Sequence, residues 1–259
     1  MAQVPQSPLT LLSPEEELVR HLSNAKGLLF DCDGTLLDTM PVYYLSWKST
    51  LADFDLPPLL PERFYSFGGM PVADIFALLL TESGKYSPSD CLPVSDVVKR
   101  LESTKRAHHE RLVSSGLSHA SPIPCVVGIA TSSDLPMAVA SSGWRDHVLS
   151  GLSKAGIETI FKSIVTAEDP AVKAPKPAPD IWFEAALRIG VSPSECVGFE
   201  DSPLGMESLR RAGVLYACDV TQLYAYPRNV EKREEEAKAK AKAEEEEEEE
   251  EGAADGQNN

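Results

Sequence analysis

A short apolar run that ends in two closely spaced carboxylates is the feature that most restricts how this chain can fold. Gly27–Phe30 is continuously apolar, Asp31 and Asp33 follow it, and Gly34 comes next. Such a run is typical of a strand in the interior of a parallel sheet. The two carboxylates would then stand at the carboxyl end of the strand, where α/β sheets place their ligands. Like charges at that edge destabilise each other unless a group of opposite charge lies between them.

Further apolar runs predict the rest of the sheet. They lie at Met137–Ala140, Ser163–Val165, Cys196–Phe199 and Val214–Ala217. The stretches between them have helical character, as at Asp180–Ile189 and Leu204–Ala212. Ser13–Leu22 opens with an N-cap residue, a proline and three acids, which predicts a short first helix. The alternation of strands and helices indicates an α/β protein with a parallel sheet.

The region between Thr39 and Cys125 follows a different pattern. Its apolar residues have helical spacing, and no strand is evident. We therefore expect a helical cap, inserted after the first strand, that closes over the site. The predicted segments are an N-terminal extension with a short helix (1–24), a core (25–39 and 126–228), the helical cap (40–125) and an acidic disordered tail (229–259).

Charge excludes one class of partner. The chain carries a net charge of −16, and residues 229–259 account for −8 of it. The remaining body is also acidic, so nothing suggests the clustered Lys and Arg of a nucleic-acid-binding face. The run of eight Glu at 244–251 is too polar to be buried and reads as a solvated tail.

Cysteine usage and hydropathy predict a cytoplasmic protein. The five cysteines are odd in number and never form a CxxC pair, so neither a disulfide framework nor a zinc site is indicated. The first nineteen residues have three acids and no Lys or Arg, unlike a signal or transit peptide. No stretch approaches the ~20 apolar residues that span a bilayer. We expect no membrane association.

A second acidic pair points to a metal. Glu200 and Asp201 end the run Cys196–Phe199, as Asp31 and Asp33 end the first one. Four carboxylates at one sheet edge repel each other unless they bind a cation, and an all-oxygen site suits Mg²⁺.

Two further segments supply groups that suit an anion. KAPKPAPD provides Lys173 and Lys176 just before a predicted helix, and its Pro-Asp context favours Lys176. MAVASS ends a strand with Ser141 and Ser142, and either hydroxyl could meet a phosphoryl oxygen. A nucleophile, an acid, an anion clamp and a metal are the parts of aspartyl-phosphate chemistry.

These segments resemble the four motifs of the haloacid dehalogenase superfamily of phosphotransferases. DCDGTLLDT resembles the first, AVASS the second, KPAPD the third and GFEDSPLG the fourth, and the resemblance extends from Ala25 to about Leu223. It implies a Rossmann-like parallel-sheet core with an inserted α-helical cap. The insert is similar to the cap of the β-phosphoglucomutase-like group, which includes sugar-phosphate phosphatases.

The resemblance also implies roles for individual residues. Asp31 would attack phosphorus and become the phosphoaspartyl intermediate. Asp33 would protonate the leaving oxygen and then activate the water that cleaves this intermediate.

The same resemblance implies the ligands of the metal and of the phosphate. Mg²⁺ would be held by Asp31 and Asp201, by the main-chain carbonyl of Asp33 and, directly or from behind, by Glu200. The phosphoryl oxygens would be bound by Ser141, with Ser142 as its competitor, and by Lys176.

The expected function is a Mg²⁺-dependent phosphatase that acts on a small phosphomonoester, a sugar or polyol phosphate. A phosphosugar mutase is the first alternative, and a phosphate-binding protein without turnover is the second. Tyr65–Phe76, which looks like the cap loop where a mutase would hold a second phosphate, contains no Arg or Lys. Tyr43 stands where the resembled mutases have a histidine. Both features favour hydrolysis.

Three lesser expectations concern the cap and the core. His108 and His109 are adjacent and cannot chelate one ion well, so they are expected on the cap surface. The aromatic residues Trp47, Phe64, Phe67 and Phe76 are expected to pack inside the cap, with a substrate-facing wall as the alternative. The segment before Met137 is short for a full helix.

Overall fold

The chain folds around a five-stranded parallel sheet. The computed structural model describes residues 12–85, 94–115 and 121–238. The strands are β1 (Gly27–Phe30), β4 (Met137–Ser141), β5 (Ser163–Thr166), β6 (Cys196–Glu200) and β7 (Tyr216–Asp219). Their order is β5-β4-β1-β6-β7, and each neighbouring pair is parallel. The predicted α/β class is confirmed, and β1 lies at the centre of the sheet.

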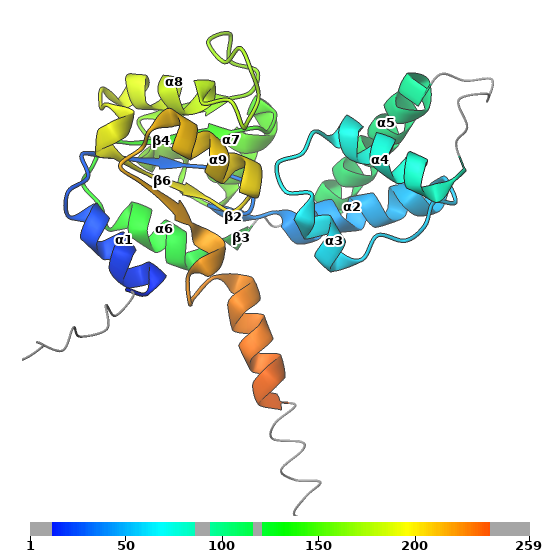
Figure 1. Ribbon diagram of the computed structural model, residues 1–259, viewed down its shortest axis with the longest axis horizontal. Coiled ribbons are helices and arrows are strands. Elements are labelled where there is room, and N and C mark those ends of the chain that lie inside the picture. The colour runs from blue at the N-terminus through cyan, green and yellow to red at the C-terminus, as the bar shows by residue number, and fades with distance from the viewer. Residues whose placement is uncertain (1–11, 86–93, 116–120, 239–259) are drawn as a thin grey trace, which may run out of the picture.

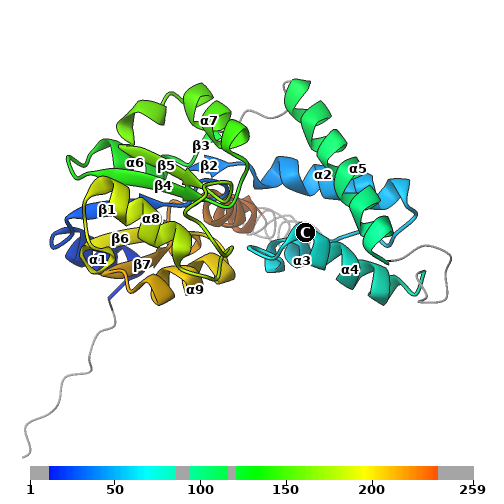
Figure 2. The ribbon, with the colours of Figure 1, turned by 90° about the horizontal axis from the view of Figure 1, so that it is seen from above.

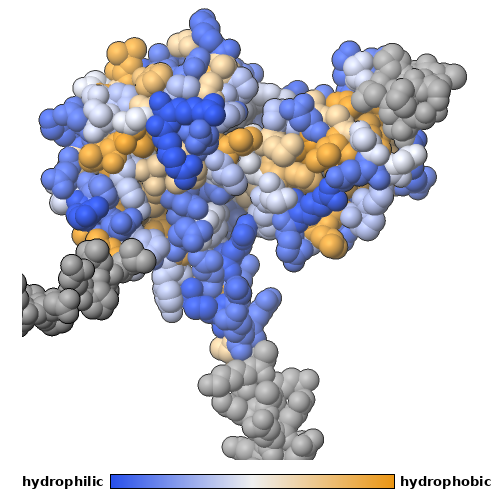
Figure 3. Space-filling view, viewed as in Figure 1, coloured by the Kyte–Doolittle hydropathy of each residue, from blue (hydrophilic) through white to orange (hydrophobic). Residues whose placement is uncertain are grey.

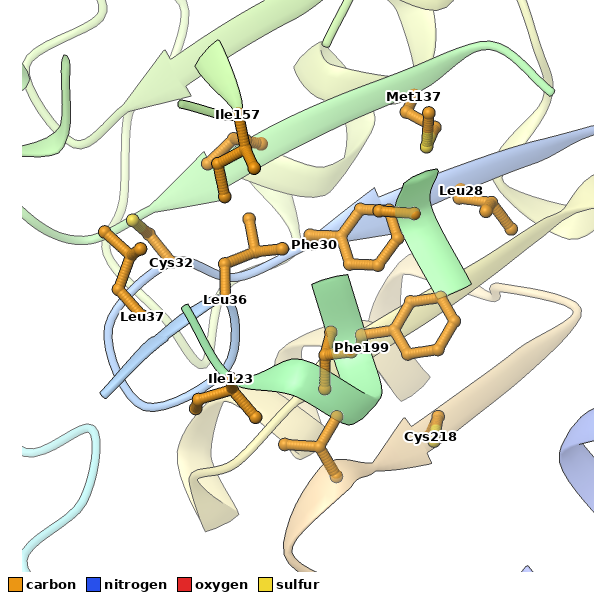
Figure 4. Close-up of a cluster of buried hydrophobic side chains, with 14 of the residues drawn as sticks. Leu28, Phe30, Cys32, Leu36, Leu37, Ile123, Met137, Ile157, Phe199 and Cys218 are labelled. Atoms are coloured by element: carbon orange, nitrogen blue, oxygen red, sulfur yellow. The ribbon is translucent and has the colours of Figure 1, made fainter. Parts of the chain in front are cut away.

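Alternating side chains of the strands pack against helices on both faces of the sheet. On one face, Leu28 and Phe30 contact a layer made by α1 (Pro14–Leu22), α6 (Pro124–Thr131) and α7 (Arg145–Lys154). On the other face, Leu29 packs against α8 (Asp180–Ile189) and α9 (Pro203–Ala212). The Phe30 ring stacks on Phe199 of β6 with 4.5 Å between centroids (Figure 4). This alternation follows from the two-residue period of a strand.

Four helices form a separate body beside the sheet (Figures 1 and 2). They are α2 (Met40–Asp53), α3 (Pro61–Ser66), α4 (Val72–Ser83) and α5 (Val94–Ser114). Their apolar faces meet in a cluster of their own that includes Trp47, Leu51, Phe76 and Leu101. The inserted helical cap is therefore present, while the exact boundaries of the predicted segments stay a prediction.

The neck between cap and core contains a pairing that the sequence analysis missed. β2 (Leu37–Asp38) pairs antiparallel with β3 (Ser121–Pro122), so the prediction of no strand between Thr39 and Cys125 was wrong. The chain leaves the core after β2 and returns to it at β3, so the two strands lie together. Two residues are too few to give a periodic signal. The short segment before β4 does form a helix, α6, of eight residues.

The remaining elements are short. The described 3₁₀ helices are η1 (Glu158–Ile160), η2 (Pro193–Glu195) and η3 (Val220–Gln222). The thiols of Cys32, Cys125, Cys196 and Cys218 are unpaired, and Cys91 lies outside the described residues. Within the described ranges, no helix has both the length and the apolar character needed to cross a membrane.

The start of the predicted disordered tail is helical. Residues 227–238 form a helix that projects from the core with a hydrophilic surface (Figure 3), so the prediction of disorder from residue 229 was wrong for its first ten residues. The Val230 N–H donates to the Tyr226 carbonyl at 3.1 Å, and Lys232 pairs with Glu236 one turn later at 3.9 Å. Opposite charges four residues apart support a helix. Residues 239–259 lie outside the described part.

The stacked rings at the centre of the sheet predict a large stability effect. Phe199→Ala removes a fully buried ring beside Phe30 and should lower the free energy of unfolding by about 3–5 kcal/mol. Phe183→Ala is the control because the Phe183 side chain on α8 is exposed. Urea unfolding measures both variants. Equal losses would show that the Phe30–Phe199 stack is not the centre of the core.

Candidate active site

The two predicted catalytic carboxylates lie at the end of the central strand. The Asp31 N–H donates to the Phe199 carbonyl at 3.0 Å, which holds Asp31 in the sheet as a buried residue. The chain then turns at Gly34, whose φ is +86°. A Cβ at this position would lie 2.3 Å from Oδ2 of Asp201. Glycine therefore allows the turn after Asp33 to pack directly on the second acidic segment.

Lys176 joins the acids of the two neighbouring strands. Its Nζ donates to Oδ1 of Asp31 at 2.6 Å and to Oε1 of Glu200 at 2.8 Å, and all three side chains are buried. The ammonium also lies 4.5 Å from the centroid of the Trp182 ring. Lys173, the competing lysine, is exposed and donates to the Pro170 carbonyl instead. The structure thus brings Lys176, and not Lys173, to Asp31.

Both carboxylate oxygens of Glu200 accept hydrogen bonds within the protein. Its Oε2 accepts hydrogen bonds from the Asp201 N–H (2.8 Å), the Ser202 N–H (2.6 Å) and the Ser202 hydroxyl (2.9 Å), while Oε1 accepts from Lys176. A Cβ at Gly205 would lie 1.7 Å from that Oε1. Of the two positions that the sequence left open for Glu200, this geometry favours the one in which Glu200 would stand behind the ligands of a bound metal.

The electrostatics of the site favour a cation. Burial raises the pKa of Asp31 to about 7 although Lys176 opposes the shift. Burial, together with the charges of Glu200 and Asp31, raises the pKa of Asp201 well above its usual range. Burial also raises the pKa of Asp33, as suits a proton donor. Removing carboxylates from water without full compensation costs free energy, and a divalent ion would reduce that cost.

The donor set fits Mg²⁺ with few protein ligands. In the described part of the chain, no three His, Cys, Asp or Glu side chains gather closely enough to hold a metal by themselves. Mg²⁺ keeps several waters and is commonly bound through one or two carboxylates. Asp31 and Asp201 form such a pair, and Oδ1 of Asp201 also accepts from the Thr35 hydroxyl at 3.1 Å.

The loop after β4 lies against Asp33. Ser141 is buried, and its Oγ accepts from the Gly143 N–H at 3.0 Å. A Cβ at Gly143 would lie 3.2 Å from both Oδ2 of Asp33 and Oγ of Ser141. Ser142 is exposed, so the structure distinguishes the two serines.

One cavity of about 420 Å³ between core and cap brings the predicted residues together. Its lining includes all seven of them: Asp31, Asp33, Ser141, Ser142, Lys176, Glu200 and Asp201. On the cap side, Trp47, Phe64 and Phe67 line the cavity, although they also belong to the apolar cluster of the cap. Phe76 is fully buried and lies outside the lining, so the aromatic residues divide between the two expected roles.

The cap contributes cations that the sequence analysis missed. Lys105 and Arg106 of α5 both line the cavity. Nζ of Lys105 lies 5.1 Å from the centroid of the Tyr43 ring and 5.5 Å from that of Trp47. Within the described residues Lys105 has no carboxylate partner closer than 4 Å, and burial lowers its pKa to about 8. Arg106 instead pairs with Glu110 at 2.9 Å.

His109 also faces the cavity, which corrects the expectation of a surface residue. Its ring stacks on Tyr43 with 4.7 Å between centroids, and burial, aided by the charge of Lys105, lowers its pKa to about 4. His108 points elsewhere and contacts Asp53 at 2.7 Å. Helical spacing could have identified these cap residues from the sequence, because residues 102, 105, 106 and 109 share one face of α5.

Comparisons with known proteins agree on one family. A family model described as haloacid dehalogenase-like hydrolase matches residues 28–218. The chain is 30% identical to the fructose-1-phosphate phosphatase YqaB of Escherichia coli over 189 residues, which cover 73% of this chain and 93% of that protein. It is 31% identical to hexitol phosphatase A of E. coli, with 73% of this chain and 80% of that protein covered.

A solved structure shares the fold at lower identity. β-Phosphoglucomutase from Clostridium difficile superposes with a TM-score of 0.58 at 19% identity, covering 74% of this chain and 83% of that one. Such a likeness supports the fold alone.

The close approach at Gly205 predicts a selective effect of one added methyl group. Gly205→Ala would push a Cβ into the Glu200 carboxylate, which four hydrogen bonds hold in place, and should lower the free energy of unfolding by about 1–3 kcal/mol. Gly128→Ala in α6 is the control, because a Cβ there meets nothing within 4 Å and should stabilise the helix by up to about 1 kcal/mol. Urea unfolding separates them. Equal stability of the two variants would contradict the packing of Glu200.

Proposed function

The chain belongs to the haloacid dehalogenase-like hydrolase family, and from this membership we propose that it is a Mg²⁺-dependent phosphatase of small phosphorylated sugars or polyols. The observation that carries the proposal is the single cavity lined by both acidic pairs, Ser141 and Lys176. A nucleophile, a proton donor, an anion clamp and a cation site thus face the same space.

In the proposed reaction, a carboxylate oxygen of Asp31 attacks phosphorus, and the bond from phosphorus to the ester oxygen breaks. Asp33 gives its proton to that leaving oxygen, and the phosphoryl group stays on Asp31. Asp33 then takes a proton from a water molecule that attacks the same phosphorus, and inorganic phosphate leaves while Asp31 is regenerated. The raised pKa of Asp33 keeps it protonated at a higher pH than an exposed aspartate and supports its first role.

The residues proposed for anion binding stand beside the nucleophile. Lys176 contacts Asp31 directly, so its charge is available to phosphoryl oxygens that approach the same carboxylate. Ser141 lies at the end of β4, next to Asp33. Asp31, Asp201 and the main-chain carbonyl of Asp33 would hold Mg²⁺, with Glu200 behind them. The bound ion would supply positive charge that offsets the negative charge of the phosphoryl group.

The relatives and the cap together suggest the substrate class. The two relatives above are named as phosphatases of fructose 1-phosphate and of hexitol phosphate, which are small polyhydroxylated esters. In this chain, aromatic side chains of the cap and the ammonium of Lys105 face the cavity. Aromatic faces pack on sugar C–H groups, and an ammonium donates to hydroxyl oxygens. The cytoplasmic location and the absence of a nucleic-acid partner stay predictions from the sequence.

A phosphosugar mutase remains the second candidate because of one observation. The loop at Tyr65–Phe76 lacks a cation, but Lys105 and Arg106 reach the cavity from α5. The cap therefore does present positive charge that could hold a second phosphate. Tyr43, in the place of the mutase histidine, still favours hydrolysis.

The central test is phosphate release by Asp31→Asn. With Mg²⁺ and a panel of C2 to C6 phosphomonoesters, the parent should release inorganic phosphate. The rate of release by the variant should be roughly a thousandfold lower or less still, because an amide is a poor nucleophile. Removal of Mg²⁺ with a chelator should abolish release, and added Mg²⁺ should restore it. Circular dichroism confirms that the variant is folded.

The products separate the candidate functions. Isomerisation of sugar phosphates without net phosphate release would establish the mutase, and binding without either reaction would establish a non-catalytic protein. A folded Asp31→Asn variant that works as fast as the parent would refute the proposed nucleophile.

A second prediction concerns Lys105. Lys105→Met keeps the length and apolar stem of the side chain but removes the ammonium, and should raise KM about tenfold while kcat changes less than about threefold. Lys99→Met on the exposed face of the same helix is the control, because Lys99 is exposed and pairs with Asp96 at 3.6 Å, away from the cavity lining. Steady-state kinetics measure both. An unchanged KM would show that Lys105 does not contact the substrate.

A further inference from the structure

The described chain continues past the family match, and the added segment packs against the turn that follows Asp33. The family model ends at residue 218, whereas the structure continues through η3 and the helix at 227–238. Hydrogen bonds connect the start of this segment to η3 and the residue after it. The side-chain amide of Asn229 donates to the carbonyls of Thr221 and Leu223, each at 2.8 Å.

Tyr226 reaches from this segment to the catalytic turn. Its hydroxyl donates to the Gly34 carbonyl at 2.7 Å, and the residue is only 5% exposed. Gly34 directly follows Asp33 and packs against the carboxylate of Asp201. The Gly34 N–H is used within the turn, where it donates to the Leu37 carbonyl at 2.8 Å. The Tyr226 hydroxyl therefore ties the turn to a segment outside the family match.

Arg228 extends the same segment to the cap. Its guanidinium carbon lies 4.0 Å from the centroid of the Tyr65 ring in α3. Tyr65 is followed by the loop at Phe67–Met70, which lines the cavity. Within the described residues Arg228 has no carboxylate partner closer than 4 Å. Tyr226 thus contacts the turn of the core, and Arg228, two residues later, contacts the cap.

We propose that residues 219–238 act as a strap between the catalytic turn and the cap. Tyr226 is a positioning residue that fixes the turn after Asp33, and Arg228 holds the cap in its observed position through Tyr65. The kinetic part of this inference rests on the proposed phosphatase activity, because there Asp33 gives its proton to the leaving oxygen. The structural part does not depend on that activity. The strap would make proton transfer and the position of the cap depend on a segment that follows the residues matched by the family model.

Tyr226→Phe tests the positioning role. The variant removes one hydroxyl from a buried site and leaves the Gly34 carbonyl without its partner. We expect kcat to fall roughly tenfold with KM changed less than twofold, because the acid is misplaced while substrate binding is kept. Tyr224→Phe is the control, because Tyr224 is 66% exposed and lies two residues away.

Hydrogen exchange supplies a readout that does not need activity. Amides of residues 31–38 should exchange faster in Tyr226→Phe than in the parent or in Tyr224→Phe, with the sheet strands unchanged. Exchange at 31–38 that matches the control, or equal kcat in both variants, overturns the role of Tyr226. If the parent shows no phosphatase activity but the exchange result appears, the proposed function fails and the physical strap stands.

Arg228→Met tests the cap contact. We expect KM to rise about two- to fivefold with kcat kept, as loss of an exposed cation–π contact implies. Arg233→Met is the matched control, because the Arg233 guanidinium lies 3.6 Å from the centroid of the Tyr224 ring and donates to the Tyr224 carbonyl at 2.6 Å, both within the same segment. Arg228→Lys should restore part of the loss. Equal KM values for the Arg228→Met and Arg233→Met variants overturn the cap part of the strap.

Discussion

The rest of the site depends on the buried ammonium of Lys176 between Asp31 and Glu200. Three charged side chains leave water together at the carboxyl edge of the sheet, and their desolvation is tolerated only because each contact is short and the other oxygen of Glu200 is hydrogen-bonded. Lys176 offsets part of the repulsion among the acids, and the Asp31–Asp201 pair is the one proposed to hold Mg²⁺. The same ammonium stands where an anion would meet Asp31. One interaction thus serves both stability and the proposed chemistry.

Core and cap would have different roles in the proposed reaction. The core presents groups that suit bond making and breaking, and they come from the ends of adjacent parallel strands, where side chains and loops converge. The cap presents aromatic faces and the ammonium of Lys105, which suit recognition of the rest of a substrate. The C-terminal segment touches both bodies, at Gly34 in the core and at Tyr65 in the cap. The cavity itself is lined by core and cap, and the C-terminal segment contacts the residues beside it.

The accuracy of the sequence analysis depended on the kind of signal available. The central strands were located to within about two residues because a buried parallel strand is a continuous apolar run. β3 was missed because two residues carry no period, and residues 229–238 were included in the disordered tail because most of them are charged. Glu200 was expected near the metal, but only the hydrogen bonds to Ser202 and Lys176 revealed that its oxygens are engaged.

The sequence alone determined the chemical groups, their order and the α/β class, because apolar periodicity and the acids that end each run are local properties of the chain. The tertiary structure decided which of those groups meet. It selected Lys176 over Lys173 and Ser141 over Ser142 by burial, brought Lys105 from a distant helix into the cavity, and placed Tyr226 against Gly34 across 192 residues of sequence. Such contacts arise from the packing of separate elements in three dimensions, and no pattern along a single chain encodes their distances.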